Sequence, residues 1–474
     1  MLSKSKNSTN VAWSFSNDQL NADVIQHIIG SDSDAIRLVG QRSQLIELVG
    51  KSKELRKGLT NSGKNSPIIL DSFFEPRGFI RLKHGASMEL TFGQEIRVTP
   101  TNHGGDIEVE TSEWGRLFQN DAPCFLGAGV AAFVPHEVNQ DNVLAKVSQA
   151  GVVHSGLEIH CPKTRLPPSF DDVQSLLSEV MCDSVDCIVI PGFEDSEDIS
   201  ILKKELKDLG DSAPWLILRI NTEKVYRNLK ELLPLVRGVL ISRIELAMCM
   251  DPARVPIVTK EIMQLCSDRA RMVLISSDIL SSMRFNATPT RAEVSDIANA
   301  SMDGADCVLL SKELSMGRFA SRGLSLAKKT IHDIETQTKL VSLNWEKQAL
   351  EITHTLAAVT FAAYRTAHRN KAKAIVCLTK KGNTAFLLGS FRTQIPVIAV
   401  TMSQRVLRRL SMIRGVYGLF IEEDLDIEHV LPRINDKIIR DTWLTAGDKI
   451  VFVSVSLSSL GEEASNLFTV QTLS

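Results

Sequence analysis

Short apolar runs alternate with amphipathic helical patterns along most of the 474-residue chain, and this rhythm narrows the possible folds more than any other feature. Strand-like runs joined by helices predict parallel βα units, because parallel strands need a long crossover connection. Three such units precede a segment that lacks the helical patterns, and five units follow it. Eight units predict a TIM (β/α)8 barrel within an α/β protein, with its chemistry at the C-terminal strand ends. The expected barrel strands are residues 10–15, 35–39, 67–70, 187–190, 215–220, 238–242, 272–276 and 306–310.

The alternation is interrupted once and is later followed by a second α/β unit. Between residues 77 and 165 short strands follow one another, which predicts an inserted all-β domain with hairpin material at 82–98 and 106–110. A capping sequence at 169–172 then predicts a helix through residue 180. A helical linker at about 329–350 leads to a smaller α/β unit. We therefore expect barrel segments at 1–76 and 166–335, the inserted β domain at 77–165, and the C-terminal α/β domain at 336–474.

Composition excludes several classes of protein. Hydrophobic residues make up 43% of the chain and charged residues 23%, which is typical of a globular protein and not of a disordered chain. The 54 Lys+Arg and 56 Asp+Glu leave a net charge of −2, so no global positive field favours nucleic acid. No apolar run reaches the length of a membrane span. The eight cysteines are scattered singly, which favours buried thiols in a reducing compartment over a disulfide or zinc framework.

The most specific stretch of the sequence is residues 289–311, which read PTRAEVSDIANASMDGADCVLLS. This stretch closely resembles a pattern of the pyruvate kinase family. The expected domain order, a barrel with a β domain inserted after its third strand and then an α/β domain, is also similar to that family's. The resemblance implies phosphoryl transfer from phosphoenolpyruvate to ADP, giving pyruvate and ATP in glycolysis. It also implies Mg²⁺ (or Mn²⁺) and K⁺ as cofactors.

Two strand ends carry the residues that the resemblance places at the divalent metal. Arg219 stands where the family has a lysine that steadies the migrating phosphoryl group, and Asn221 stands where it has a metal-binding glutamate. Glu245 matches the second metal carboxylate, next to Arg243 as a substrate-binding cation. Because arginine is larger than lysine and an amide lacks a carboxylate's charge, these changes imply an altered metal site. Ile244 replaces a glycine whose backbone approaches the substrate carboxylate in the family.

Further matches to the family's active site lie on other expected strands. The resemblance implies that Arg37 binds substrate and that Ser277 keeps a hydroxyl beside the enolate carbon. It also implies that Glu245 binds substrate as well as the divalent metal, and that Ser277 is a catalytic residue. Asp71 and Ser72 match two of the ligands of the monovalent cation. Several family residues are therefore kept or conservatively replaced, while the lysine, the metal glutamate and the carboxylate-binding glycine are all changed.

The C-terminal unit contains two polar features of interest. The loop after its first expected strand resembles the loop with which regulated family members bind sugar-phosphate effectors. Its candidate residues are Thr379, Lys380, Gly382 and Thr384, and an ordinary strand–helix turn is the alternative interpretation. A basic cluster at 405–414 has helical spacing, which predicts a solvated or subunit-facing helix.

Two functions are compatible with these residues. One is a pyruvate kinase whose altered site leaves weak activity, with Arg219 near the phosphoryl group and Glu245 on the metal. The other is a catalytically inactive homologue that acts as a regulatory or structural subunit, in which Arg219 is a structural cation paired with Glu245. We expect a homo- or hetero-oligomer with pyruvate kinase subunits and no nucleic-acid or membrane partner. The expected location is the cytoplasm or the plastid stroma, because the divergence is similar to that of plant plastid members.

Overall fold

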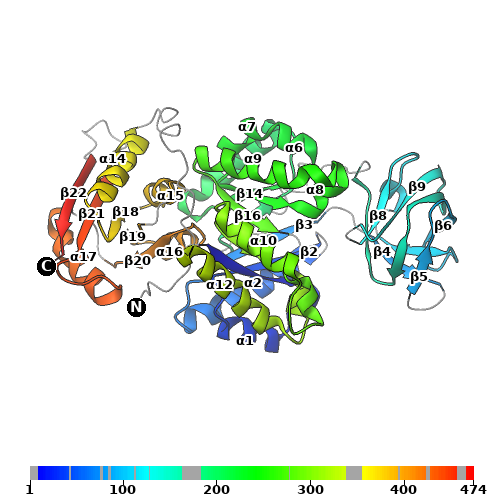
Figure 1. The fold of residues 1–474 in the computed structure, drawn as a ribbon, viewed down its shortest axis with the longest axis horizontal. Coiled ribbons are helices and arrows are strands. Elements are labelled where there is room, and N and C mark those ends of the chain that lie inside the picture. The colour runs from blue at the N-terminus through cyan, green and yellow to red at the C-terminus, as the bar shows by residue number, and fades with distance from the viewer. Residues whose placement is uncertain are drawn as a thin grey trace.

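The computed structural model describes residues 9–473 except 42–43, 75–77, 84–86, 112–113, 128, 163–182, 277, 338–354, 393–394, 423–426 and 456–465. Figure 1 shows a central barrel wrapped by helices, with a small β barrel on one side and an open sheet with helices on the other. The helix expected at 169–180 lies outside the described residues, and the domain boundaries stay predictions. Among the described helices, none is both long enough and apolar enough to cross a membrane.

Eight parallel strands close the central barrel, and each expected run forms one of them. Alternate positions along the strands belong to separate core clusters. Leu70, Leu218 and Ile275 pack with the surrounding helices, whereas Ile69 and Ile217 belong to the cluster that fills the barrel and continues into the C-terminal domain. The strands are β1 (Asn10–Ser16), β2 (Ala35–Gln41), β3 (Ile68–Phe74), β13 (Cys187–Ile190), β14 (Trp215–Ile220), β15 (Gly238–Ser242), β16 (Met272–Ser276) and β17 (Cys307–Leu309).

Helices cover the outside of the barrel. The segment that carries the family resemblance forms α10 and begins with a capping box, in which the Thr290 hydroxyl accepts from the Glu293 amide and the Glu293 carboxylate accepts from the Thr290 amide. Thr290 and Glu293 of this segment therefore have a structural role, because they begin α10. The described helices of this part are α1 (Ala22–Gly30), α2 (Leu45–Asn61), α5 (Ser196–Leu206), α6 (Glu223–Arg227), α7 (Leu229–Leu232), α8 (Arg243–Cys249), α9 (Val255–Asp268), α10 (Arg291–Met302), α11 (Lys312–Ser315) and α12 (Ala320–Gln337).

The inserted segment forms a second, smaller closed barrel, in the order β10-β6-β7-β4-β12-β8-β9. The hairpin expected at 82–98 is wrong, because β4 pairs with β7 and β12, and β5 pairs with β11 in a separate two-stranded sheet. One short helix, α3 (Trp114–Leu117), interrupts the strands. The strands are β4 (Gly78–Leu82), β5 (Ser87–Leu90), β6 (Glu95–Pro100), β7 (Ile107–Glu110), β8 (Cys124–Leu126), β9 (Ala131–Val138), β10 (Val143–Gln149), β11 (Gly151–His154) and β12 (Glu158–His160).

The C-terminal unit is an open five-stranded sheet in the order β20-β19-β18-β21-β22. Four strands are parallel, as expected for an α/β unit, and the fifth, β22, pairs antiparallel with β21 and was not predicted. The strands are β18 (Ala374–Leu378), β19 (Val397–Thr401), β20 (Val416–Phe420), β21 (Lys449–Val455) and β22 (Asn466–Thr472). The described helices are α14 (Thr355–Arg369), α15 (Asn383–Ser390), α16 (Gln404–Leu410) and α17 (Ile427–Asp441).

The basic cluster on and after α16 is buried against the barrel, so the expectation of a solvated or subunit-facing helix is wrong. Arg405 pairs with Asp183 at 2.7 Å, and Arg408 pairs with the fully buried Asp186 at 2.9 Å. Both acids precede β13 at the N-terminal end of the barrel. These ion pairs join the C-terminal sheet to the barrel end opposite the one that carries the candidate active-site residues.

Candidate functional site

A layer of polar side chains lies at the C-terminal end of the barrel interior. Strand alternation explains the layer, because residues two apart on a strand share a face. Arg37 lies two residues after Ala35 on β2, Asp71 lies two residues after Ile69 on β3, and Arg219 lies two residues after Ile217 on β14. The preceding residues belong to the apolar interior cluster, so the polar side chains form the next layer above it. All three are buried, with exposed fractions of 6%, 0% and 4%.

Asp71 is the centre of this layer. Arg37 donates from Nε to Asp71 Oδ2 at 2.9 Å and also from Nη2, while Arg219 donates from Nη2 to Asp71 Oδ1. Burial alone would raise the pKa of the Asp71 carboxyl. The charges and hydrogen bonds of Arg219 and Arg37 outweigh burial and hold that pKa below its usual range. The Asp71 carboxylate therefore accepts hydrogen bonds from two arginines on different strands.

Arg219 also reaches the second acidic residue of the site. Its Nη1 lies 3.4 Å from Glu245 Oε1, on the first turn of α8. The Arg219 guanidinium thus bridges Asp71 and Glu245, and the ion pair with Glu245 that was one of two interpretations of Arg219 is present. The family resemblance makes Glu245 a ligand of a divalent metal, and here its Oε1 lies at ion-pair distance from a cation of the protein itself.

Asn221 lies two residues after Arg219, just beyond the end of β14, and is fully buried. Its side chain packs against the loop after β13 so closely that a Cβ added at Gly192 would lie 2.3 Å from Asn221 Oδ1. Among the described residues, neither amide atom of Asn221 has a hydrogen-bond partner. Cys249 Sγ donates to the backbone carbonyl of Asn221 at 3.5 Å. This environment encloses a neutral side chain at the position that the resemblance matches to a metal-binding glutamate.

The ion pairs of these residues would oppose the binding of a divalent metal. Mg²⁺ needs near-octahedral oxygen ligands and is usually held by one or two carboxylates. In the described part of the chain, no group of three or more His, Cys, Asp or Glu side chains is placed to hold a metal. Asp71 and Glu245 are both ion-paired to Arg219. A dication there would have to compete with a guanidinium that stays protonated at any physiological pH.

Of the two residues expected to bind a monovalent cation, only the side chain of Asp71 can be described. Both carboxylate oxygens of Asp71 accept hydrogen bonds from arginines. The cations beside Asp71 are therefore side chains of the protein itself. The side chain of Ser72 lies outside the described part, and its role stays a prediction.

The remaining candidates are distributed around the mouth of the barrel. Arg243 pairs with Asp296 of α10 at 3.1 Å, and Ser277 lies outside the described residues. Two residues were not singled out from the sequence. Ser276 accepts a hydrogen bond from Arg37 Nη1 at 3.3 Å, and its interior position on β16 could have identified it. Asp278 has a positive φ of 45°, and burial raises the pKa of its carboxyl to about 6, with further contributions from Glu313 and Glu158.

The candidate effector loop has the structure of a strand–helix turn. Thr379 Oγ1 accepts a hydrogen bond from the Gly382 amide at 2.9 Å, and Gly382 has a φ of 86° that favours glycine. A Cβ at Gly382 would contact Trp215 of the barrel at 3.7 Å. Thr379 and Thr384 are both buried, and Lys380 is exposed. The contacts of this turn are structural, and its role in effector binding stays a prediction.

Comparison with known proteins agrees with the resemblance in the sequence. The family model "Pyruvate kinase, barrel domain" matches residues 42–324, and "Pyruvate kinase, alpha/beta domain" matches residues 357–470. Pyruvate kinase of Clostridium acetobutylicum is 24% identical over 412 residues, covering 86% of this chain and 85% of that protein. Pyruvate kinase of Methanocaldococcus jannaschii is 27% identical over 345 residues, covering 70% and 73%.

Among solved structures, Cryptosporidium parvum pyruvate kinase in complex with ADP has the same fold. Its TM-score with this chain is 0.84 at 19% sequence identity, and the match covers 99% of this chain and 96% of that one. The barrel model alone spans more than half of the chain. The chain belongs to the pyruvate kinase family.

Proposed function

We propose that this chain is a catalytically inactive member of the pyruvate kinase family that acts as a regulatory or structural subunit. The observation that carries the proposal is the Arg219 guanidinium, which bonds Asp71 and lies 3.4 Å from Glu245. Phosphoryl transfer depends on metal ions that bridge the phosphate oxygens and neutralise the developing charge. In this chain, the Arg219 guanidinium is paired with Asp71 and Glu245, the carboxylates expected to bind such ions.

Charge balance supports this function. Arg37, Arg219 and Arg243 face Asp71, Glu245 and Asp296 at the mouth of the barrel, and these side chains pair with one another. A divalent ion at Asp71 and Glu245 would have to displace the Arg219 guanidinium from both carboxylates. Asn221 supplies an amide oxygen, but its side chain is neutral and confined against Gly192. The charges of these three arginines and three acids therefore balance one another within the protein.

The second candidate function is the family reaction itself, with phosphoenolpyruvate and ADP as substrates and Mg²⁺ (or Mn²⁺) and K⁺ as cofactors. It is favoured by the three arginines, because guanidinium groups are suited to carboxylate and phosphate groups. On this interpretation Arg219 would leave Glu245 when substrate binds. That movement would break buried ion pairs, so it would oppose substrate binding.

Metal-dependent binding of phosphoenolpyruvate separates the two functions. We expect calorimetric titration of the purified chain with Mn²⁺ to show no site tighter than about 1 mM. We also expect any phosphoenolpyruvate binding to be the same with Mn²⁺ as with EDTA. Lys230→Ala, on an exposed face of α7, provides a control for general effects of charge. Saturable Mn²⁺ binding that is lost in Glu245→Ala, or phosphoenolpyruvate binding that requires Mn²⁺, would contradict the inactive assignment.

The assembly and the location of the protein follow from the same proposal. A regulatory subunit needs a partner, and we propose other pyruvate kinase subunits, in a homo- or hetero-oligomer. We propose the cytoplasm or the plastid stroma as its location, since the seven described cysteines are free thiols and five of them are buried.

A further inference from the structure

A cavity of about 740 Å³ lies where the N-terminal end of the barrel meets the C-terminal domain. Residues of α5, of the segment leading into β14 and of the segments leading into β15 and β16 form its barrel side. Lys381, Val406 and Arg409 approach it from the C-terminal domain. The cavity is therefore at the opposite end of the barrel from Arg219 and Glu245. Its volume is in the range of small-molecule sites.

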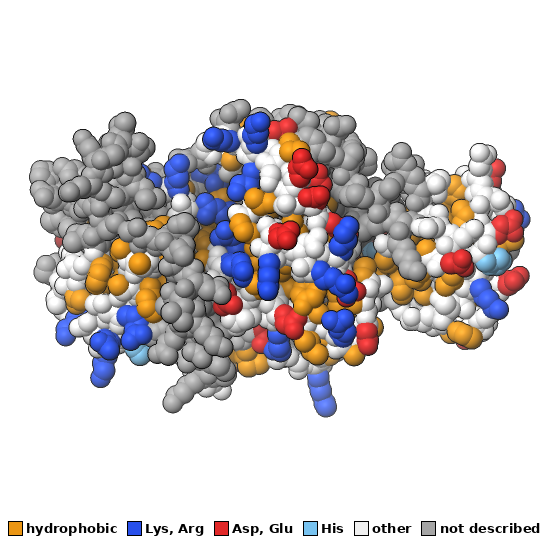
Figure 2. Space-filling view, turned by 90° about the horizontal axis from the view of Figure 1, so that it is seen from above, with side chains coloured by type: hydrophobic (Ala, Val, Ile, Leu, Met, Phe, Trp, Pro, Cys, Tyr) orange, Lys and Arg blue, Asp and Glu red, His pale blue; other side chains and the backbone are white. Residues whose placement is uncertain are grey.

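The lining of this cavity is strongly basic. None of its eighteen lining residues, all of them within the described part of the chain, is Asp or Glu. The chain as a whole has nearly balanced charges, with a net charge of −2. Figure 2 shows Lys and Arg side chains gathered on the part of the barrel surface that lies toward the C-terminal domain. The seven basic lining residues are Lys203, Lys204, Lys207, Arg237, Arg271, Lys381 and Arg409.

The arginines are held in place by groups that leave their charge uncancelled. Arg271 donates from Nε to the carbonyl of Leu233 at 2.8 Å, and Arg409 donates to the carbonyl of Ala213. The guanidinium groups of Arg237 and Arg409 lie 5.7 Å and 5.6 Å from the Trp215 ring centroid. Within the described residues, no carboxylate lies at ion-pair distance from these three arginines. Among the described residues, these three arginines are thus oriented cations without an anionic partner.

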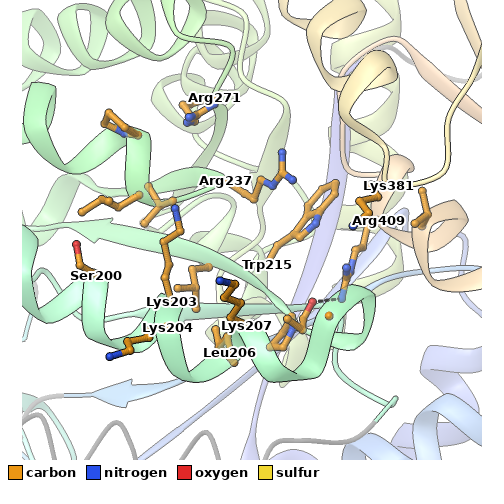
Figure 3. A pocket seen from close by; sticks show the side chains of 18 residues that line it. Ser200, Lys203, Lys204, Leu206, Lys207, Trp215, Arg237, Arg271, Lys381 and Arg409 are labelled. Carbon is orange, nitrogen blue, oxygen red and sulfur yellow. Dashed lines mark hydrogen bonds between the residues drawn. The ribbon is translucent and has the colours of Figure 1, made fainter. Parts of the chain in front are cut away.

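The basic side chains converge from two directions. In Figure 3, Lys203 extends from α5 toward Arg237 and Arg271, while Arg409 and Lys381 lie on the other side of Trp215. Burial lowers the pKa of Lys203, and the charges of Arg271 and Arg237 lower it further. Burial also lowers the pKa of Arg409 to about 10, and repulsion from Arg405 adds to this effect. A bound anion would relieve this repulsion between like charges.

We propose that the cavity binds a small organic molecule with two or more phosphate groups. Phosphate is the anion that lysine and arginine bind best together, because lysine supplies a point charge and arginine a planar pair of donors. Leu206, Trp215, Leu216 and Val236 give the cavity an apolar wall for the organic part. The ligand would contact the barrel and the C-terminal domain at once and would therefore strengthen their junction.

This site is separate from the two sites considered above. Thr379, Lys380, Gly382 and Thr384 of the candidate effector loop do not line the cavity. The residues of the barrel mouth are absent from its lining too. The inference does not depend on whether the chain catalyses the family reaction.

Titration calorimetry with inorganic pyrophosphate, and then with glucose 1,6-bisphosphate, tests the site on the full chain. We expect saturable binding of both probes at low ionic strength, with the bisphosphate bound more tightly because of the apolar wall. Lys203→Glu places an acid among the cations at an exposed helix position and should weaken binding at least about tenfold. Lys203→Ala combined with Arg237→Gln should weaken it similarly. Lys230→Ala, which removes a charge from outside the cavity, should leave the affinity unchanged.

Three outcomes would overturn the proposal. The first is the absence of saturable binding of either probe at millimolar concentration. The second is unchanged affinity in Lys203→Glu, which is an exposed substitution that leaves the core intact. The third is loss of binding in Lys380→Ala with binding retained in both cavity variants, which would assign the phosphates to the effector loop. The result for the barrel mouth is measured separately by Mn²⁺ titration, so the two proposals can fail independently.

Discussion

Replacement of Asp71 by asparagine is expected to lower the free energy of unfolding by about 3–5 kcal/mol, the cost of removing one partner from a buried ion pair. Asp71 is fully buried and bonds both Arg37 and Arg219. The neutral amide would leave two buried guanidinium groups without a charged partner. Urea denaturation followed by tryptophan fluorescence measures the change at neutral pH.

The control for this substitution is Asp296→Asn. Asp296 also pairs with an arginine, Arg243, but its side chain is 46% exposed. Solvent screens such a pair, so its loss should cost no more than about 1 kcal/mol. If Asp71→Asn cost no more than Asp296→Asn, Asp71 would not be the centre of the charged layer.

The effect of Asp71 should depend on pH in a defined direction. The pKa of its carboxyl is lowered in the folded protein, so its stabilising contribution is present above the unfolded pKa of about 3.9. This contribution is lost as the pH falls through the lower, folded value. The stability difference between the wild type and Asp71→Asn should therefore be constant near neutral pH and shrink only in acid.

The second large effect is expected from placing the two residues that the family resemblance implies at the end of β14. Arg219→Lys combined with Asn221→Glu should create a Mn²⁺ site at least about tenfold tighter than any in the wild type, a difference of about 1.4 kcal/mol. The shorter lysine lacks the fork that bridges Asp71 and Glu245, and the new glutamate supplies a second carboxylate beside Glu245. Electron paramagnetic resonance of Mn²⁺ measures free and bound ion directly.

Two further variants distinguish the causes of this gain. Arg219→Gln releases Glu245 without adding a carboxylate and should give a smaller gain. The double variant with Glu245→Ala added should lose the site. A folded double variant that binds no Mn²⁺ would show that something other than Arg219 and Asn221 prevents metal binding, and Ile244 on α8 would then be the next residue to replace.

The barrel could be predicted from sequence because its signals are local. Each strand is a short apolar run, and several of the helices between strands begin with a side-chain cap, as at Thr290 and Glu293. Strand pairing in the inserted segment could not be predicted in this way. β5 pairs with β11, more than sixty residues further along the chain, and nothing in the run of residues 82–98 indicates that partner.

The contacts of charged residues were the least predictable part. Arg405 and Arg408 were expected on a solvated or subunit-facing helix, because a sequence does not show that Asp183 and Asp186 lie opposite them. Within the site, the Arg219–Glu245 pair was one of two interpretations. The sharing of Asp71 by Arg37 and Arg219 was not foreseen, because it depends on three strands placing side chains in one layer.

Pyruvate formation by the purified chain tests the central claim, that Arg219 replaces the catalytic metal, most directly. The assay contains phosphoenolpyruvate, ADP, K⁺ and either Mg²⁺ or Mn²⁺, with Glu245→Ala as the matched control. We expect no turnover above that of the control. Turnover of about 1 s⁻¹ or more that is abolished in Glu245→Ala would contradict the claim and identify the chain as an active pyruvate kinase.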